Sequence, residues 1–131
     1  MTNDGELVLV IDDSEIYRYF ARATLQSAGY RVALAASATD GLQLVNERKP
    51  HIVCIDQHLP DGNSTTVATA LRQSMAQFSC AIVALSGSSA EQTRRQALDA
   101  GAHVFLEKDP SAHSLLAAVR TASARSRSGR A

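Results

Sequence analysis

Five short apolar runs are spaced along the chain, and each is followed by a segment of mixed polarity. The runs are rich in aliphatic and β-branched residues and cover residues 7–11, 30–35, 51–55, 81–85 and 102–106. The runs at 7–11 and 51–55 are continuously apolar, which is typical of strands buried on both faces. The run at 30–35 alternates, and it predicts a strand with a more exposed face.

Helical periodicity fills the segments between these runs. Apolar residues, among them Ile16, recur near helical spacing from Glu15 to Ala28, and Gly29 ends the pattern. Further helices are predicted at 37–49, at 64–75, at 90–100 and from residue 109 onward. Expected helix caps are Asp13 or Ser14, Ser37, and Asp109 followed by Pro110 at the first helical position.

The strict alternation of five strands and five helices predicts an α/β fold with one doubly wound, five-stranded parallel sheet. At 131 residues, with 45% hydrophobic and 20% charged residues, the chain has the size and balance of a single folded domain. The segment at 123–131 is low in apolar content, and we expect residues 1–125 to form the domain and 126–131 a disordered tail or linker stump.

Charge and cysteine usage narrow the function classes. Thirteen basic and thirteen acidic residues give a formal net charge of zero, so no overall field favours nucleic acid or an anionic membrane. The two cysteines, Cys54 and Cys80, lie in or beside apolar runs and are expected to be buried free thiols. The first six residues lack a signal-peptide pattern, and no apolar run approaches a membrane span. We therefore expect a cytoplasmic protein.

Four polar signals come just after the ends of predicted strands. They are the pair Asp12–Asp13, then Asp56, Ser86 and Lys108. In a doubly wound sheet the carboxyl ends of the strands lie at one edge, where ligands bind in the crevice at the reversal of strand order. If the first and third strands flank that reversal, the three aspartates meet there.

The chemistry of this set points to a phosphoryl group and a hard cation. Three neighbouring carboxylates repel one another unless a cation offsets them, and oxygen ligands with room for water suit Mg²⁺. Ser86 offers a hydroxyl donor and Lys108 a point charge for phosphoryl oxygens. Taken singly, each residue has a plainer interpretation: Asp12–Asp13 as a helix cap, Ser86 as a turn hydroxyl and Lys108 as a solvated charge. Their joint occurrence favours the functional interpretation.

These residues lie in four stretches that together resemble one known family. The stretches are VLVIDDS at Val8–Ser14, VCIDQHLPDG at Val53–Gly62, VALSG at Val83–Gly87 and AGAHVFLEK at Ala100–Lys108. The chain is similar, from about residue 6 to residue 125, to response-regulator receiver domains, the phosphoacceptor modules of two-component signalling. The resemblance implies the flavodoxin-like receiver fold with strand order 2-1-3-4-5.

The resemblance also implies a role for each matching residue. Asp56 resembles the phosphoacceptor, and Asp12 and Asp13 resemble the acidic pair that binds Mg²⁺, with the backbone carbonyl of His58 as a further ligand. Ser86 resembles the switch hydroxyl and Lys108 the lysine that bonds the phosphoryl group. Phe105, on the fifth predicted strand, resembles the switch aromatic.

The function implied is that of a phosphorylation-activated binding module, and not of an enzyme in its own right. The phosphodonor would be a histidine kinase or a histidine phosphotransfer protein. Phosphorylation would switch the surface of the fourth helix, fifth strand and fifth helix, either for an unknown downstream partner or for homodimerisation. No direct contact with nucleic acid or membrane is expected. The alternatives are a receiver-like scaffold that acts without phosphorylation and an aspartate-nucleophile phosphatase, although the latter expects two aspartates spaced by one residue after the first strand.

Two positions depart from the family pattern. Asp109 stands between Lys108 and Pro110, where many receivers place proline directly after the lysine, and the geometry of the Lys108–Asp109 bond is left open. His58 lies two residues after the acceptor. Its side chain is either a rim residue or an imidazole that tunes access of water to the phosphoryl group. His103 is expected to be packed or hydrogen-bonded.

Overall fold

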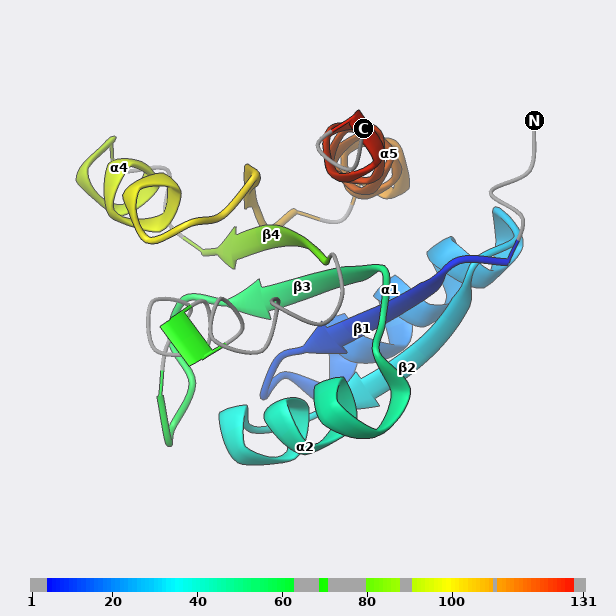
Figure 1. The fold of residues 1–131 in the computed structure, drawn as a ribbon, viewed down its shortest axis with the longest axis horizontal. Helices are drawn as coiled ribbons and strands as arrows, with labels where there is room; N and C mark the ends of the chain where they lie inside the picture. The colour runs from blue at the N-terminus through cyan, green and yellow to red at the C-terminus, as the bar shows by residue number, and fades with distance from the viewer. Residues whose placement is uncertain (1–4, 63–68, 71–79, 88–90, 110, 129–131) are drawn as a thin grey trace.

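The computed structural model describes residues 5–62, 69–70, 80–87, 91–109 and 111–128. Five parallel strands form one sheet in the order β2-β1-β3-β4-β5, as the sequence predicts (Figure 1). The strands are β1 (Leu7–Ile11), β2 (Arg31–Ala35), β3 (Ile52–Asp56), β4 (Ala81–Ser86) and β5 (Val104–Glu107). The predicted fold class is thereby confirmed, and the order reverses between β1 and β3.

Helices cover both faces of this sheet (Figure 1). They are α1 (Glu15–Ser27), α2 (Ala38–Arg48), α4 (Glu91–Asp99) and α5 (Ala112–Ser128). The helix predicted at 64–75 lies outside the described residues, except for residues 69–70, which are helical. Among the helices in the described part of the chain, none combines the length and the hydropathy needed to cross a membrane.

Two apolar clusters form the core, one on each face of the sheet. Leu9 and Ile55 point to the face that α2 covers, where they meet Val45. Val10 and Cys54 point to the opposite face, where they meet Leu25 of α1 and other residues of α1 and α5. Every residue of β1, β3 and β4 is buried, which explains why these strands read as continuous apolar runs. The two cysteines are buried free thiols, as expected.

Side-chain caps and left-handed residues set the helix ends. Ser14 caps α1, because its hydroxyl accepts from the backbone N–H of Tyr17, and Ser37 caps α2 in the same way from Asp40. Lys49 ends α2 with a positive φ of 47°, directly before Pro50. Gly101, predicted to stop the fourth helix, has a φ of 120°, a conformation that glycine adopts without strain.

The start of α5 differs from the prediction. The helix begins at Ala112, and Ser111 is its cap: the Ser111 hydroxyl accepts from the N–H of Ser114. The carboxylate of Asp109 instead accepts from the N–H of Ser111 and orders the turn that precedes the helix. Residue 110 lies outside the described residues. The described backbone holds no cis peptide bond, which answers the open question at Lys108–Asp109.

The end of α5 also differs. The helix continues to Ser128, three residues past the boundary predicted at 125. Ser123, the first residue of the stretch predicted to fray, is buried and donates a hydrogen bond from its hydroxyl to the Glu6 carboxylate at 2.8 Å. This contact between distant parts of the chain is not visible in local composition. Residues 129–131 lie outside the described residues.

Two histidines complete the hydrogen bonding at the amino ends of neighbouring strands. The backbone N–H of Leu7 donates to Nδ1 of His51, and that of Ile82 donates to Nδ1 of His103, both at 3.0 Å. The prediction that His103 is hydrogen-bonded is confirmed. Both imidazoles lie at the end of the sheet opposite to the aspartates.

Candidate functional site

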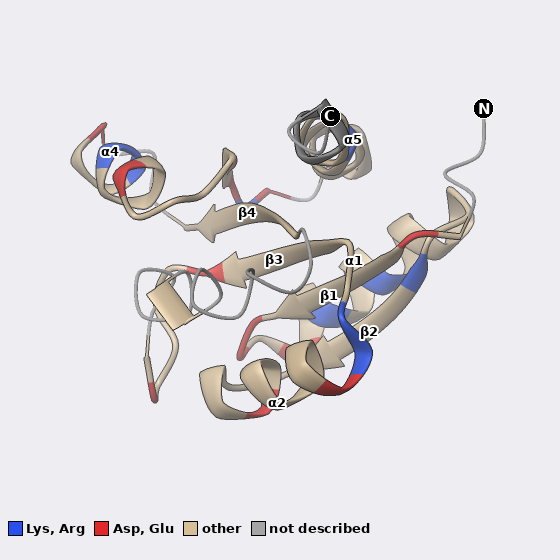
Figure 2. Cartoon of the chain, in the orientation of Figure 1, with Lys and Arg blue, Asp and Glu red and all other residues tan. Residues whose placement is uncertain are grey.

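Three aspartates converge at the carboxyl ends of β1 and β3, where acidic segments appear in red in Figure 2. One carboxylate oxygen each of Asp12, Asp13 and Asp56 lies within 4.8 Å of the others. Asp12 and Asp56 are buried, whereas Asp13 is exposed. The prediction that the reversal of strand order between β1 and β3 would bring these residues together is confirmed.

The backbone around Asp12 holds its carboxylate in place. Its N–H donates to the Ala35 carbonyl at 3.0 Å and so extends the pairing of β1 with β2 by one residue. Its carboxylate accepts from the N–H of Ser14, and its carbonyl accepts from the Arg18 guanidinium at 2.8 Å. The first turn of α1 therefore fixes both polar ends of this residue.

Lys108 reaches two of the three carboxylates from the end of β5. Its Nζ lies 2.9 Å from Asp12 Oδ2 and 3.5 Å from Asp56 Oδ2. The Lys108 backbone N–H donates to the Ser86 carbonyl at 2.7 Å, which ties it to the end of β4. The ammonium also lies 5.2 Å from the centre of the Tyr17 ring, within the range of a cation–π contact.

Burial and charge shift the pKa values in this site. Burial raises the pKa of Asp56, and the charge of Asp12 adds to the rise, while the His58 N–H and Lys108 oppose it. Burial disfavours the charged form of Lys108, yet the hydrogen bond to Asp12 and the charges of both carboxylates raise its pKa above the ordinary value. Burial also raises the pKa of the Tyr17 phenol. The site thus holds closely spaced carboxylates with a charged ammonium between them.

The residues after Asp56 differ sharply in exposure. The N–H of His58 donates to Asp56 Oδ1 at 3.2 Å, while the His58 side chain is exposed. Gln57 is buried: its N–H donates to the Leu85 carbonyl at 2.7 Å, and its amide nitrogen lies 3.5 Å from the Thr93 carbonyl of α4. His58 therefore lies at the mouth of the site, with its backbone N–H directed to Asp56.

Ser86 and Phe105, the two candidate switch residues, lie on adjacent strands. Ser86 is fully buried at the last position of β4, one residue beyond Leu85, which pairs with Asp56. Phe105 pairs with Ala84 in the middle of β5 and is partly exposed. Of the described apolar side chains, Val104 and Leu106 pack into the core on the α1 and α5 face, and strand alternation directs Phe105 to the other face.

A small apolar crevice of about 340 Å³ adjoins the aspartates, and sequence reasoning missed it. It is lined by Ser14, Ile16, Tyr17, Phe20, Lys108 and Asp109. Ile16, which the helical pattern predicts among the apolar positions of α1, is 84% exposed at its rim. Its neighbour Tyr17 and Phe20 one turn later pack against the core on the α1 side of the sheet, whereas Ile16 lines the crevice.

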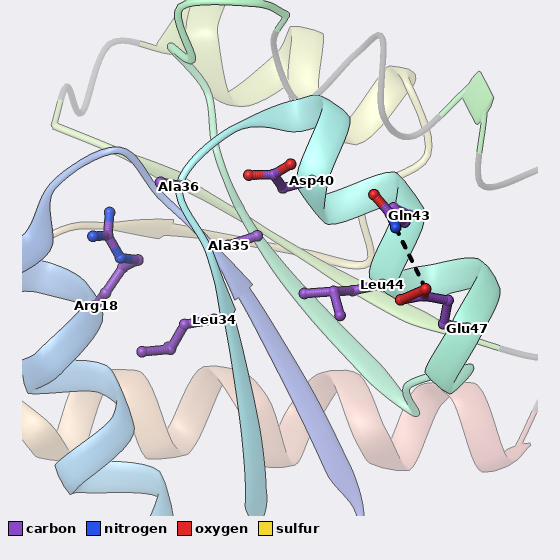
Figure 3. Close-up of a pocket in the computed structure, with 8 residues that line it drawn as sticks. All are labelled: Arg18, Leu34, Ala35, Ala36, Asp40, Gln43, Leu44 and Glu47. Atoms are coloured by element: carbon purple, nitrogen blue, oxygen red, sulfur yellow. Dashed lines mark hydrogen bonds between the residues drawn. The ribbon is translucent and has the colours of Figure 1, made fainter.

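A second groove, of about 410 Å³, lies between α1, the end of β2 and α2 (Figure 3). It is lined by Arg18, Leu34, Ala35, Ala36, Asp40, Gln43, Leu44 and Glu47. The Gln43 amide donates to the Glu47 carboxylate at 3.4 Å along the helix, which Figure 3 draws as a dashed line. Of the three converging aspartates, none is among the described residues that line this groove.

Comparison with known proteins agrees with this geometry. The family model for the response regulator receiver domain matches residues 8–120. This chain belongs to the response regulator receiver domain family. Asp12, Asp13, Asp56, Ser86, Phe105 and Lys108 all lie within the matched residues of this receiver domain.

Curated relatives of the receiver domain include transcriptional regulators. The KDP operon transcriptional regulatory protein KdpE of Escherichia coli is 36% identical over 122 residues, which are 93% of this chain and 51% of that protein. The photosynthetic apparatus regulatory protein RegA of Rhodobacter capsulatus is 33% identical, over 86% of this chain and 60% of that protein. The chain thus spans about half the length of the curated relatives it matches.

Solved structures share the same fold. The chemotaxis protein CheY4 of Vibrio cholerae aligns with a TM-score of 0.82 and 26% identity, over 89% of this chain and 98% of that one. NtrX of Brucella abortus aligns with a TM-score of 0.88 and 24% identity, over 99% of this chain and 29% of that one. The receiver fold therefore accounts for nearly all of this chain.

Proposed function

We propose that this receiver domain accepts a phosphoryl group on Asp56 from a histidine kinase or a histidine phosphotransfer protein. The observation that carries the proposal is the convergence of Asp56 with Asp12, Asp13 and the Lys108 ammonium at one sheet edge. Incubation with a small-molecule phosphodonor, followed by intact-mass measurement, tests it.

The transfer is the attack of an Asp56 carboxylate oxygen on phosphorus, while the bond from phosphorus to the donor histidine nitrogen breaks. Lys108 lies 3.5 Å from Asp56, close enough to bond the oxygens of the transferred group. Asp12 is held by Ser14 and Lys108 and cannot swing away as charge is added. Catalysis by this site is mostly positioning and charge compensation.

The three aspartates fit a Mg²⁺ ion. Their oxygens are hard ligands within 4.8 Å of one another, and the exposed Asp13 leaves an open side for water. Three carboxylates face a single described ammonium, so a divalent cation would balance the remaining negative charge. Asp12, Asp13, Asp56 and, by family resemblance, the His58 carbonyl would hold the ion. When bound, Mg²⁺ would neutralise charge on the phosphoryl oxygens.

In this proposal the chain is a switch that assists its own phosphorylation and dephosphorylation, and not an enzyme acting on other substrates. The Ser86 hydroxyl would bond the phosphoryl group, and Phe105 would turn inward from its partly exposed position. Those movements would bias the surface of α4, β5 and α5 between two states. That surface would bind a downstream partner or a second copy of the chain.

The relatives suggest the wider context. KdpE and RegA are named as regulatory proteins, and the match to this chain covers 51% and 60% of their lengths, so an effector region elsewhere in a longer protein is one route for output. Because the formal net charge is zero, no overall positive field would attract nucleic acid, and we propose no direct nucleic-acid contact for this domain. The two free cysteines are compatible with a reducing compartment, and we propose the cytoplasm.

The exposed Ile16 provides a test of how the phosphodonor binds. Ile16→Ala is expected to slow phosphotransfer from a kinase about tenfold, because an apolar side chain that is 84% exposed at the rim of the apolar crevice offers a contact for the donor protein. Phosphorylation by acetyl phosphate, which needs no protein contact, should stay unchanged. Tyr19→Ala, at the other exposed apolar residue of α1, is the matched control. Equal slowing with both donors would contradict a docking role.

His58 provides a test of the lifetime of the phosphorylated state. If its imidazole controls water access to the phosphoryl group, His58→Ala should change the rate of autodephosphorylation. The exposed side chain at the mouth of the site motivates this expectation. The decay of the phosphorylated protein, followed by mass between about pH 6 and about pH 8, measures it. Identical decay of both proteins at every pH would reduce His58 to a rim residue.

A further inference from the structure

Asp61 lies in the loop of residues 57–62 that follows Asp56, which we call the acceptor loop, and it binds the start of α2. The Asp61 side chain is exposed, yet its carboxylate makes three hydrogen bonds with the start of α2. Oδ1 accepts from the Ala38 N–H at 2.8 Å, and Oδ2 accepts from the Thr39 N–H at 3.0 Å and the Thr39 hydroxyl at 2.7 Å. These hydrogen bonds lower the pKa of Asp61 to about 2, and the bond from the Thr39 hydroxyl has the largest effect.

Asp61 and Ser37 divide the free N–H groups of α2 between them. A helix start leaves N–H groups without partners inside the helix. Ser37 accepts from the Asp40 N–H, while Asp61 accepts from the Ala38 and Thr39 N–H groups. One cap is local in sequence, and the other comes from more than twenty residues away. Only the Asp61 cap joins α2 to another part of the chain.

The acceptor loop is closed tightly around Asp61. The N–H of Leu59 donates to the Gly62 carbonyl at 3.0 Å, and the Gly62 N–H donates back at 3.4 Å. Leu59 is buried in the core beneath α2. Residues 57–62 therefore form a short loop with Asp56 at its start and the Asp61 carboxylate at its tip.

The helix at the other end of this contact is firmly seated on the sheet. Gly41 packs against Ile11 so closely that an added Cβ would overlap the Ile11 side chain. Ile11 is the last residue of β1 and directly precedes Asp12. Because α2 rests on β1, a loop bonded to α2 is held relative to the Asp12 carboxylate.

We propose that Asp61 is a positioning residue for phosphoryl transfer. By anchoring the acceptor loop to α2, it holds His58 and the Asp56 carboxylate in place relative to Asp12. The inference rests on the proposed function of Asp56. Loss of the anchor frees the backbone of residues 57–62, including the His58 N–H that bonds Asp56 and the His58 carbonyl expected to bind Mg²⁺. A simple cap of α2 would affect the stability of the helix and leave the site unchanged.

The pair Asp61→Ala and Ser37→Ala separates these two roles. Each variant removes one cap from the same helix end, but only Asp61→Ala releases the acceptor loop. Both should lower the melting temperature. Asp61→Ala should also weaken Mg²⁺ binding to the unphosphorylated protein about tenfold, the lower end for groups that support metal ligands, and should speed hydrogen exchange at the His58 N–H. Ser37→Ala should change neither. Mg²⁺ titration and amide exchange followed by NMR provide the measurements.

Two milder variants keep the proposal testable if Asp61→Ala does not fold. Asp61→Asn keeps an acceptor oxygen, and Thr39→Val removes one donor from the helix side; both should shift Mg²⁺ affinity in the same direction as Asp61→Ala, but less. Unchanged Mg²⁺ affinity and exchange in all Asp61 variants would overturn the proposal, and so would equal changes in Ser37→Ala. Phosphorylation of the wild type is scored separately: if it fails while Asp61→Ala still weakens Mg²⁺ binding, the proposed function fails and the anchor stands.

Discussion

Asp56→Asn is expected to abolish phosphorylation by acetyl phosphate in the presence of Mg²⁺. The amide oxygen is a far weaker nucleophile than a carboxylate, and the substitution also removes the negative charge of one of the three converging carboxylates. The fold should survive, because the amide retains an oxygen that can accept from the His58 N–H. Intact-mass measurement should show one added phosphoryl group in the wild type and none in the variant.

A matched control and metal removal define the specificity of this result. Asp99→Asn changes an exposed aspartate at the end of α4 and should be phosphorylated like the wild type. Adding a chelator should suppress phosphorylation of both the wild type and Asp99→Asn, if the aspartates work with a bound divalent cation. A wild type that gains no phosphoryl group would instead favour the scaffold alternative, in which the domain binds partners without phosphorylation.

Lys108→Ala is expected to impair both chemistry and stability. The substitution leaves the fully buried Asp12 carboxylate facing Asp56 without the ammonium that now lies between them. We expect unfolding to become easier by about 2 kcal/mol, less than the roughly 3–5 kcal/mol of a fully buried pair, because the Lys108 side chain is 20% exposed. Phosphorylation by acetyl phosphate should fall by at least about tenfold, since one charge partner of the transferred group is lost. Chemical denaturation and intact-mass time courses measure the two effects.

The stability loss in Lys108→Ala should depend on pH in a defined direction. Burial raises the pKa of Asp56, and Lys108 opposes that rise, so the variant raises this pKa further. A carboxyl with a raised folded-state pKa stabilises the fold at low pH and loses that contribution as pH rises through the folded-state value. The difference between variant and wild type should therefore be largest at neutral pH and should shrink as pH falls toward the ordinary aspartate value of about 3.9.

The second lysine of the chain provides the control for that experiment. Lys49→Asn removes an exposed ammonium at the end of α2, where asparagine tolerates the positive φ of 47°. This variant should retain stability and phosphorylation at every pH. A pH-independent loss in Lys108→Ala would mean that packing of the lysine stem, and not its charge, supports the site.

Much of the fold follows from local sequence signals. Short stretches of sequence were enough to predict the buried strands β1 and β3, the helix caps at Ser14 and Ser37, and the glycine that follows α4. Each depends on interactions within a few residues. Two predictions about α5 failed. The helix continues past residue 125, and Ser123 is bonded to the distant Glu6. It begins at Ala112 because Ser111, and not Asp109, caps it, a choice between two nearby polar residues that composition alone does not decide.

The candidate site divides in the same way. Asp12, Asp13, Asp56, Ser86 and Lys108 could be identified because each follows a predicted strand, and parallel strands end at a common edge. The contacts of Tyr17 with Lys108 and of Asp61 with α2 could not, because no pattern in the sequence pairs residues so far apart. The exposure of Ile16 was also missed, since an apolar residue near helical spacing can lie at the margin of the buried face, as Ile16 does beside Tyr17.

The order of elements, the buried strands and the residues that meet at the sheet edge are all predictable from the sequence, because strand and helix periodicity reflect burial directly. Three features become visible only in the folded chain: the 2.9 Å bond of Lys108 to Asp12, the apolar crevice beside it and the hydrogen bonding of Asp61 to the start of α2. These features depend on side-chain directions at the ends of elements, where loops from distant parts of the chain meet and local periodicity carries no information.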